Sequence, residues 1–190
     1  MKKINLVGSA AVGLMVASGS AHAAGDQIIE IDLNGWQTWG RLGSTNNTSI
    51  VIDLSATYGN DFQITGVGWD LTIASIGSSW NSEVVFDIDG GVFVTPGTGT
   101  TGTASYSSGG IIKLVDANIA DIQISDGDFR IEVFESFDDP NNTDTGQVQD
   151  ANLSDSFFIQ LPIPAPGAFG LLGIAGLIGV GGVGGRRRNI

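Results

Sequence analysis

The 190-residue chain contains no cysteine and only one histidine. Without cysteine it can have no disulfide framework, thiolate nucleophile, or Cys-ligated zinc or iron–sulfur site. The single histidine, His22, lies in a segment that we expect to be removed, so the mature protein would lack an imidazole for Ser-His-Asp catalysis or metal binding. Positive charge is also scarce. The 8 Lys+Arg against 20 Asp+Glu give a net charge of −12, which excludes the basic footprint that a nucleic-acid partner requires.

The N-terminus shows the three regions of a secretory signal peptide, which we predict over residues 1–23. Lys2 and Lys3 form the positive region, and an apolar run of about a dozen residues follows, too short to span a bilayer comfortably. Ala21-His22-Ala23 is a small-x-small site, so we expect signal peptidase to cut between Ala23 and Ala24. The alternative is an uncleaved amphipathic helix, which the all-round apolar character of the run disfavours. The protein is therefore expected to be exported.

The C-terminus reads as a membrane anchor. A Pro-rich spacer at 162–167 precedes an uncharged run at 168–185, which as a helix would extend about 27 Å, enough for the hydrocarbon core. Arg186, Arg187 and Arg188 follow within the terminal segment 186–190, and the positive-inside rule places them in the cytoplasm. Everything upstream would then lie outside the inner membrane. On this interpretation the tail is a permanent transmembrane helix.

A second interpretation treats the same tail as a sorting signal. The motif Pro164-Ala165-Pro166-Gly167, the glycine-rich span and the terminal arginine cluster together resemble the tail of the PEP-CTERM family of bacterial exported proteins. Ala165 stands where the usual motif of that family has Glu. The resemblance implies recognition by an exosortase-type membrane enzyme that cuts near the proline motif. It also implies transient anchoring in the inner membrane, and then a place at the cell surface or in the extracellular matrix.

Between these ends, residues 24–161 form one acidic domain. All 20 acidic residues of the chain lie between Asp26 and Asp155. Three basic residues, Arg41, Lys113 and Arg130, accompany them, so the segment has a net charge of −17. This charge keeps a protein soluble, repels anionic polymers and attracts divalent cations.

The hydrophobic pattern of this domain has the period of strands. Apolar residues alternate with polar ones in short runs separated by Gly, Asn, Asp and Ser, and no stretch shows a sustained helical period. The pattern predicts eight or nine strands and an antiparallel β-sandwich of jelly-roll or immunoglobulin-like type. Residues 95–110 and 138–150 are predicted to be long loops. The clearest inward-facing positions are Ile29, Ile31, Leu33, Ile50, Ile52, Leu54, Val67, Trp69, Leu71, Ile73, Val84, Phe86, Ile88, Ile122, Ile124, Phe129, Ile131, Val133, Phe157, Ile159 and Leu161.

Calcium is the one cofactor that the sequence suggests. Asp138, Asp139, Asn141 and Asp144 crowd oxygen ligands into one loop, which suits a cation that takes six to eight oxygens. The pairs Asp87–Asp89 and Asp126–Asp128 also place carboxylates two residues apart. The alternative is that these are ordinary turn residues in an acidic exported protein, and none of the three segments matches the EF-hand template.

Carbohydrate binding is a second hypothesis, based on four tryptophans. Trp36 and Trp39 flank a turn bordered by glycines, where at least one indole could be exposed and stack on a sugar ring. Trp69 is in register with apolar neighbours and is expected in the core. The alternative is that Trp36 and Trp39 are core or loop-anchoring residues.

Catalysis has the least support. The domain has no His and no Cys, so a carboxylate pair of the glycosidase type is what remains, and none of the acidic residues is singled out for that role. We therefore expect a structural or interaction protein at the cell surface or in the extracellular matrix, not an enzyme. The alternative is a carbohydrate-binding β-sandwich module, calcium-dependent if the Asp138–Asp144 loop holds an ion, with extracellular polysaccharide as its partner.

Overall fold

The predicted strands are present and form mostly antiparallel sheets. The computed structural model describes residues 2–4, 26–137 and 149–162. The elements within these ranges are β1 (Lys2–Ile4), β2 (Asp26–Asp32), β3 (Trp36–Thr38), β4 (Ser49–Asp53), α1 (Ser55–Tyr58), β5 (Phe62–Ile64), β6 (Gly66–Ser75), η1 (Asn81–Glu83), β7 (Val84–Ile88), β8 (Val92–Val94), β9 (Thr103–Ser107), β10 (Ile112–Lys113), η2 (Val115–Ala117), β11 (Ile122–Ile124), β12 (Asp128–Glu135) and β13 (Ala151–Pro162).

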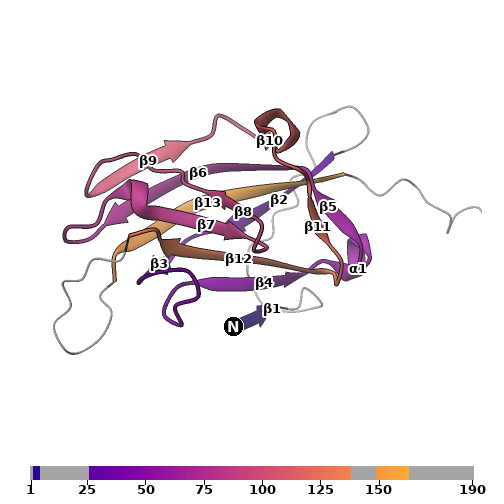
Figure 1. Ribbon diagram of the computed structural model, residues 1–190, viewed down its shortest axis with the longest axis horizontal. Helices are drawn as coiled ribbons and strands as arrows, with labels where there is room; N and C mark the ends of the chain where they lie inside the picture. Colours follow the sequence, from indigo (N-terminus) through magenta and orange to yellow (C-terminus); the bar gives the residue numbers. More distant parts are fainter. Residues whose placement is uncertain (1, 5–25, 138–148, 163–190) are drawn as a thin grey trace, which may run out of the picture.

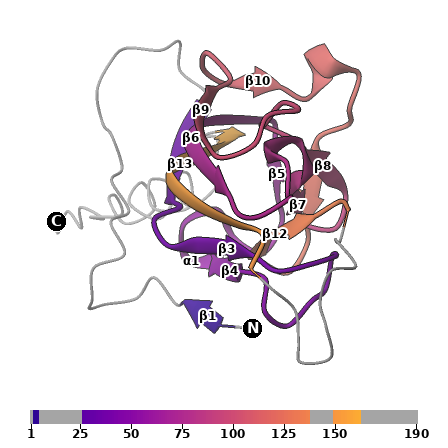
Figure 2. The same ribbon diagram turned by 90° about the vertical axis from the view of Figure 1, so that its left-hand side faces the viewer.

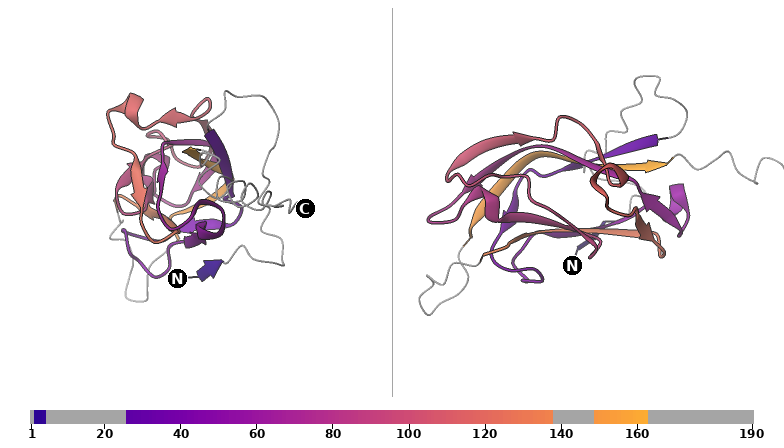
Figure 3. Two further views of the ribbon diagram at one scale, coloured as in Figure 1. Left: turned by 90° about the vertical axis from the view of Figure 1, so that its right-hand side faces the viewer. Right: turned by 45° about the horizontal axis from the view of Figure 1, so that its top comes forward.

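Two sheets account for most of these strands. The β12 sheet has the order β1-β4-β12-β7-β8, and the β13 sheet has the order β10-β6-β13-β2, with β3 paired to β13 and β9 paired to β6. A small third sheet joins β5 and β11. Neighbouring strands are antiparallel except for β1, which runs parallel to β4. The two large sheets lie in separate layers that face each other (Figure 2 and the right panel of Figure 3), as in a β-sandwich.

The core lies between the two layers and is built from the predicted inward faces. In β12 the inward residues are Phe129, Ile131 and Val133, and all three are fully buried. Phe86 of the β12 sheet stacks on Phe157 of the β13 sheet with a centroid distance of 4.9 Å. Burying such aromatic and branched side chains is the main force that holds the layers together. The period-two prediction for these strands is confirmed.

Several details of the sequence prediction are wrong. The described residues contain thirteen strands, the one-turn helix α1 and two 3-10 turns, where eight or nine strands without a helix were expected. The predicted loop 95–110 contains β9, whose backbone pairs with β6 from Thr103 to Ser107. Every residue of β7 is buried, including Asp87, so this strand has no exposed polar face. The reason is that other groups cover part of the outer surface of the β12 sheet. Arg130 lies against Asp87, and the loop that holds Gly43 lies against Glu132.

The continuous part of the domain from β2 to β13 begins and ends at the same place. Asp26, the first residue of β2, is paired directly with Pro162, the last residue of β13. In Figure 1 this end of the domain lies on the right, and the opposite end, which holds β3 and the turn that precedes β9, lies on the left. We call the first end the paired-termini end and the second the loop end.

Most of the predicted terminal segments lie outside the described residues. This applies to 5–23 of the signal peptide, its cleavage site at Ala23 and Ala24, the proline motif at 164–167, the span 168–185 and the arginines at 186–188. Within the described ranges, no helix is long and apolar enough to cross a membrane.

Candidate functional site

The structure separates the two tryptophans that were predicted to bind carbohydrate. Trp36 is 6% exposed and its ring packs against Phe86, with centroids 6.4 Å apart. A buried indole offers no face to a sugar ring, so the prediction for Trp36 is wrong. Trp39 is half-buried and its indole Nε1 donates to Gln37 Oε1 at 3.2 Å; its role as a sugar-binding residue stays a prediction. Trp69 packs partly buried against the core, as expected.

The exposed indole belongs to Trp80, for which the sequence predicts no position in the fold. Half of this residue is exposed. It lies at the loop end, in the segment between β6 and η1. The sequence around Trp80 indicates this exposure, because Trp80 follows Gly77-Ser78-Ser79 and lies outside every alternating apolar run. A tryptophan in a turn segment has no core face to occupy.

The backbone around Trp80 is fixed by reciprocal hydrogen bonds. The amide of Trp80 donates to Glu83 Oε2 at 2.8 Å, and the amide of Glu83 donates to the carbonyl of Trp80 at 2.9 Å. The indole lies against Gly99, since a Cβ at that position would be 3.3 and 3.4 Å from two ring carbons. The turn therefore fixes the backbone of Trp80, and the ring packs against the glycine backbone.

Next to Trp80, a small polar cluster joins two loops. Asn81 is fully buried, and its Nδ2 donates to the Tyr106 hydroxyl at 3.0 Å and to Thr100 Oγ1 at 3.3 Å. The two hydroxyls are hydrogen-bonded to each other at 2.7 Å. Asn81 Oδ1 is also buried, and within the described residues it has no hydrogen-bond partner. We call Trp80, Asn81, Gly99, Thr100 and Tyr106 together the Trp80 platform.

The polar cluster affects the ionisation of Tyr106. Burial opposes loss of its proton, but hydrogen bonds from Thr100, Asn81 and Thr98 outweigh burial and lower the pKa of the hydroxyl. Hydrogen bonds to a phenol oxygen stabilise negative charge on it. The Tyr106 hydroxyl is therefore a stronger hydrogen-bond donor than an ordinary phenol.

Other apolar side chains are exposed at the same end of the domain. Leu42, Ile76 and Phe137 are 45%, 38% and 55% exposed. Backbone hydrogen bonds connect their loops to one another, from Glu135 to Gly40, from Ser136 to Glu83 and from Ile76 to Asp150. The loop end is thus a connected set of turns that carries apolar groups at its surface.

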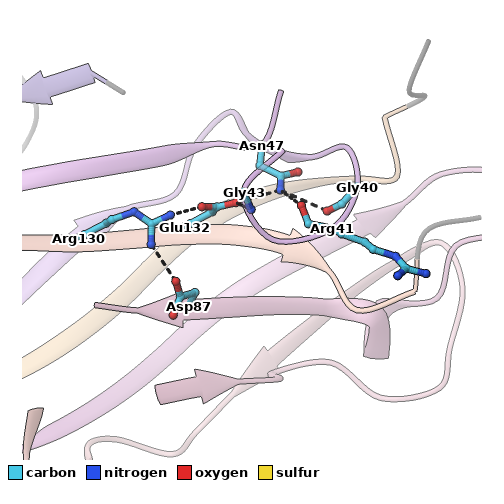
Figure 4. A network of polar contacts seen from close by, with 7 residues as sticks. All are labelled: Gly40, Arg41, Gly43, Asn47, Asp87, Arg130 and Glu132. Atoms are coloured by element: carbon cyan, nitrogen blue, oxygen red, sulfur yellow. Dashed lines mark hydrogen bonds and ion pairs between the residues drawn. The ribbon is translucent and has the colours of Figure 1, made fainter. Parts of the chain in front are cut away.

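A charged network on the outer surface of the β12 sheet supports one of these loops (Figure 4). Arg130 donates to Asp87 Oδ2 at 2.8 Å and also to Glu132 Oε2. Glu132 Oε1 accepts from the Gly43 amide at 2.7 Å and from Asn47 Nδ2 at 3.1 Å. Asp87 and Glu132 are 1% and 2% exposed. The network thereby attaches the loop to the sheet.

Within that loop, Asn47 makes most of the attachments. Its Nδ2 also donates to the carbonyls of Gly40 and Arg41, at 3.2 and 3.0 Å, and its Oδ1 accepts from the Trp39 amide at 2.9 Å. The Arg41 side chain points away from the network in Figure 4. Because each partner is engaged in holding the chain, we assign this cluster a positioning role.

The acidic pairs that suggested calcium have different surroundings. Asp87 is bound to Arg130, and Asp126 Oδ1 accepts from the Asp128 amide at 3.0 Å in a tight turn. Burial raises the pKa of Asp89, and the charges of Asp126 and Asp87 raise it further, against the lowering effects of a backbone hydrogen bond from Arg130 and of its charge.

No set of three or more acidic or histidine side chains in the described ranges is placed to hold a metal ion. The favoured calcium loop, with Asp138, Asp139, Asn141 and Asp144, lies outside those ranges. The calcium site in this loop therefore stays a prediction.

Comparison with known proteins gives no relative. No protein-family model matches the chain, and neither a curated protein nor a solved structure shows significant similarity to it. The function has to be argued from this chain alone.

Proposed function

We propose that this protein is exported and displayed at the cell surface or in the extracellular matrix. In this proposal signal peptidase removes residues 1–23, which include the edge strand β1, and the tail at 164–188 holds the chain in the inner membrane. An exosortase-type enzyme of the kind that acts on PEP-CTERM proteins then cuts near Pro164–Gly167. The β domain has a structural or interaction role and is not an enzyme. We further propose that the domain is a jelly-roll or immunoglobulin-like sandwich, and that a signal helix and a transmembrane helix flank it.

The observation that carries the proposal is the pairing of Asp26 with Pro162. The predicted export signal and the predicted sorting tail join the domain at these two neighbouring strand ends. A domain attached at one end presents the other end. The twelve residues of β13, at about 3.3 Å per residue, extend about 40 Å between the two. The loop end would therefore face away from the membrane, which is the geometry required for display.

Charge supports the same role. The acidic residues outnumber the basic ones by 17 between Asp26 and Asp155, which favours solubility outside the membrane and disfavours contact with anionic polymers. A domain of this kind needs no cofactor to be displayed.

The intact mass of the native protein from inner-membrane, outer-envelope and medium fractions tests the proposal. We expect a species that begins at Ala24 and ends near Pro164–Gly167, found outside the inner membrane. A species that still runs to Ile190 and occurs only in the inner membrane would make the tail a permanent anchor. The sorting proposal would then be wrong.

A second candidate function is carbohydrate binding, in which the domain is a module for extracellular polysaccharide. The observation that favours it is the half-exposed indole of Trp80 at the loop end, which is carried on a hydrogen-bonded turn. The test is a titration of the protein with soluble polysaccharides, followed by tryptophan fluorescence.

A further inference from the structure

We infer that the Trp80 platform is a binding site for neutral polysaccharides, in which a pyranose ring stacks on the indole of Trp80. This inference rests on the proposed carbohydrate-binding function and assigns it a site and a ligand class. Trp80 takes the sugar-stacking role that was predicted for Trp36, whose ring is buried in the core. It is independent of how the C-terminal tail is processed.

The backbone that carries the indole is fixed by hydrogen bonds, and one part of the ring packs against Gly99. Two of these hydrogen bonds attach Trp80 to Glu83. A flat indole on an ordered backbone provides apolar contact area at a small cost in conformational entropy. The C–H face of a pyranose ring is the complement of such a surface.

The polar part of the site has unused hydrogen-bonding capacity. Thr100 and Tyr106 share one hydroxyl proton between them, and Thr98 is a further hydrogen-bond partner of Tyr106, so the second hydroxyl proton has either Thr98 or a ligand as its acceptor. Asn81 Oδ1 is buried next to them and, among the described residues, has no donor. A buried acceptor without a donor is costly, and a water that bridges it to a sugar hydroxyl would remove that cost.

Charge selects among polysaccharides. All five residues of the platform are neutral, whereas Glu83 beside it and the domain as a whole are negative. An anionic polymer would meet repulsion without a cationic partner at the site. We therefore assign neutral polysaccharides, and expect an acidic one such as alginate not to bind.

The location suits a polymer in the surroundings of the cell. In Figure 1 the β9 region, which supplies Tyr106, lies at the opposite end of the domain from the start of β2. A protein attached through its paired-termini end would leave the platform accessible.

The experiment uses the purified full-length chain in detergent and three neutral probes, laminarin, dextran and galactomannan, with alginate as the acidic probe. Affinity electrophoresis measures binding, and tryptophan fluorescence reports on the indole. We expect one or more neutral probes to bind and to shift the emission. Trp80→Ala should weaken that binding at least tenfold, and Tyr106→Phe should weaken it several-fold.

The matched control is Phe93→Ala, because Phe93 is an aromatic residue of similar exposure (57%) that packs on Phe134 of the β12 sheet and is not a member of the platform. It should bind as the unchanged protein does. Thermal melting shows that each variant is folded; a half-exposed side chain such as Trp80 can be removed at modest cost. Absence of binding to all three neutral probes, equal binding by Trp80→Ala, or tighter binding of alginate would overturn the inference.

Processing is followed separately, by the intact mass of the Trp80→Ala protein from cells. Normal processing with weakened polysaccharide binding supports the site. Normal processing with undiminished binding overturns the site and leaves the display proposal standing. A tail that remains uncut in the unchanged protein, together with Trp80-dependent binding, overturns the sorting proposal and leaves the site standing.

Discussion

The side-chain amide of Asn47 donates to the carboxylate of Glu132 at 3.1 Å, although the two residues are 85 positions apart in the chain. Through this contact a loop that carries Trp39 and Leu42 is attached to the middle of the β12 sheet. Arg130 compensates the buried charge of Glu132 from the other side. The surface of the loop end thus depends on a network buried under it.

Removing one member of this network should destabilise the fold. Glu132→Ala leaves Arg130 with one carboxylate, deprives the Gly43 amide of its side-chain acceptor and removes one of the three acceptors of Asn47 Nδ2. We expect the free energy of unfolding to fall by about 2–4 kcal/mol, measured by urea denaturation. The exposed Asp121 provides the control, because Asp121→Ala should change stability by less than about 0.5 kcal/mol. Equal effects of the two variants would show that the network does not support the loop.

The stability of the protein should depend on the charge of Asp89. Its pKa is raised in the folded state above the ordinary value of an aspartate, chiefly by burial and then by the charges of Asp126 and Asp87. The stabilising contribution of this group is therefore complete below about pH 4 and is lost as the pH rises through the raised pKa.

The variant that tests this is Asp89→Asn, which removes the charge and still tolerates the left-handed backbone at this position (φ 52°). We expect a higher melting temperature than that of the unchanged protein at pH 7, and no difference at pH 3. A lower melting temperature at pH 7 would mean that Arg130 stabilises the charge more than burial and its acidic neighbours oppose it.

The turn under Trp80 should not tolerate a side chain at Gly97. A Cβ there would lie 2.1 Å from the carbonyl oxygen of Asn81, which is a backbone atom with little freedom to move. We expect Gly97→Ala to lower the free energy of unfolding by about 1–3 kcal/mol. The control is Gly91→Ala, since nothing lies within 4 Å of a Cβ at Gly91. If both variants melt at the same temperature, Gly97 does not lie as close to the Asn81 carbonyl as the structure shows.

Calcium should stabilise the protein if the loop with Asp138, Asp139, Asn141 and Asp144 binds it. A ligand that binds only the folded state raises the melting temperature with concentration. We expect a rise at millimolar calcium in the unchanged protein and none in an Asp138→Asn/Asp144→Asn variant. Magnesium, which prefers a smaller and more rigid octahedral site, is the control and should have a smaller effect. A melting temperature that does not change with calcium would contradict the prediction of a calcium site in this loop.

The sequence was sufficient to predict the inward faces of the strands that show an alternating pattern. Successive side chains of a strand point to opposite sides, so an alternating run such as Phe157, Ile159 and Leu161 identifies its buried face without any knowledge of its partner. All three of these side chains are fully buried. The sequence also showed the scarcity of basic residues, because charge is a property of composition.

The tertiary structure decided which polar and aromatic side chains are covered. Trp36 and Trp80 both lie near turn residues, yet one is 6% and the other 50% exposed. Thr103 to Ser107, which has a loop-like composition, is a strand because β6 supplies its hydrogen-bonding partner. Asp87 and Glu132 are buried because Arg130 and a loop distant in sequence meet them. Local pattern determines which way a side chain points, whereas burial depends on what packs against it, and that partner comes from elsewhere in the chain.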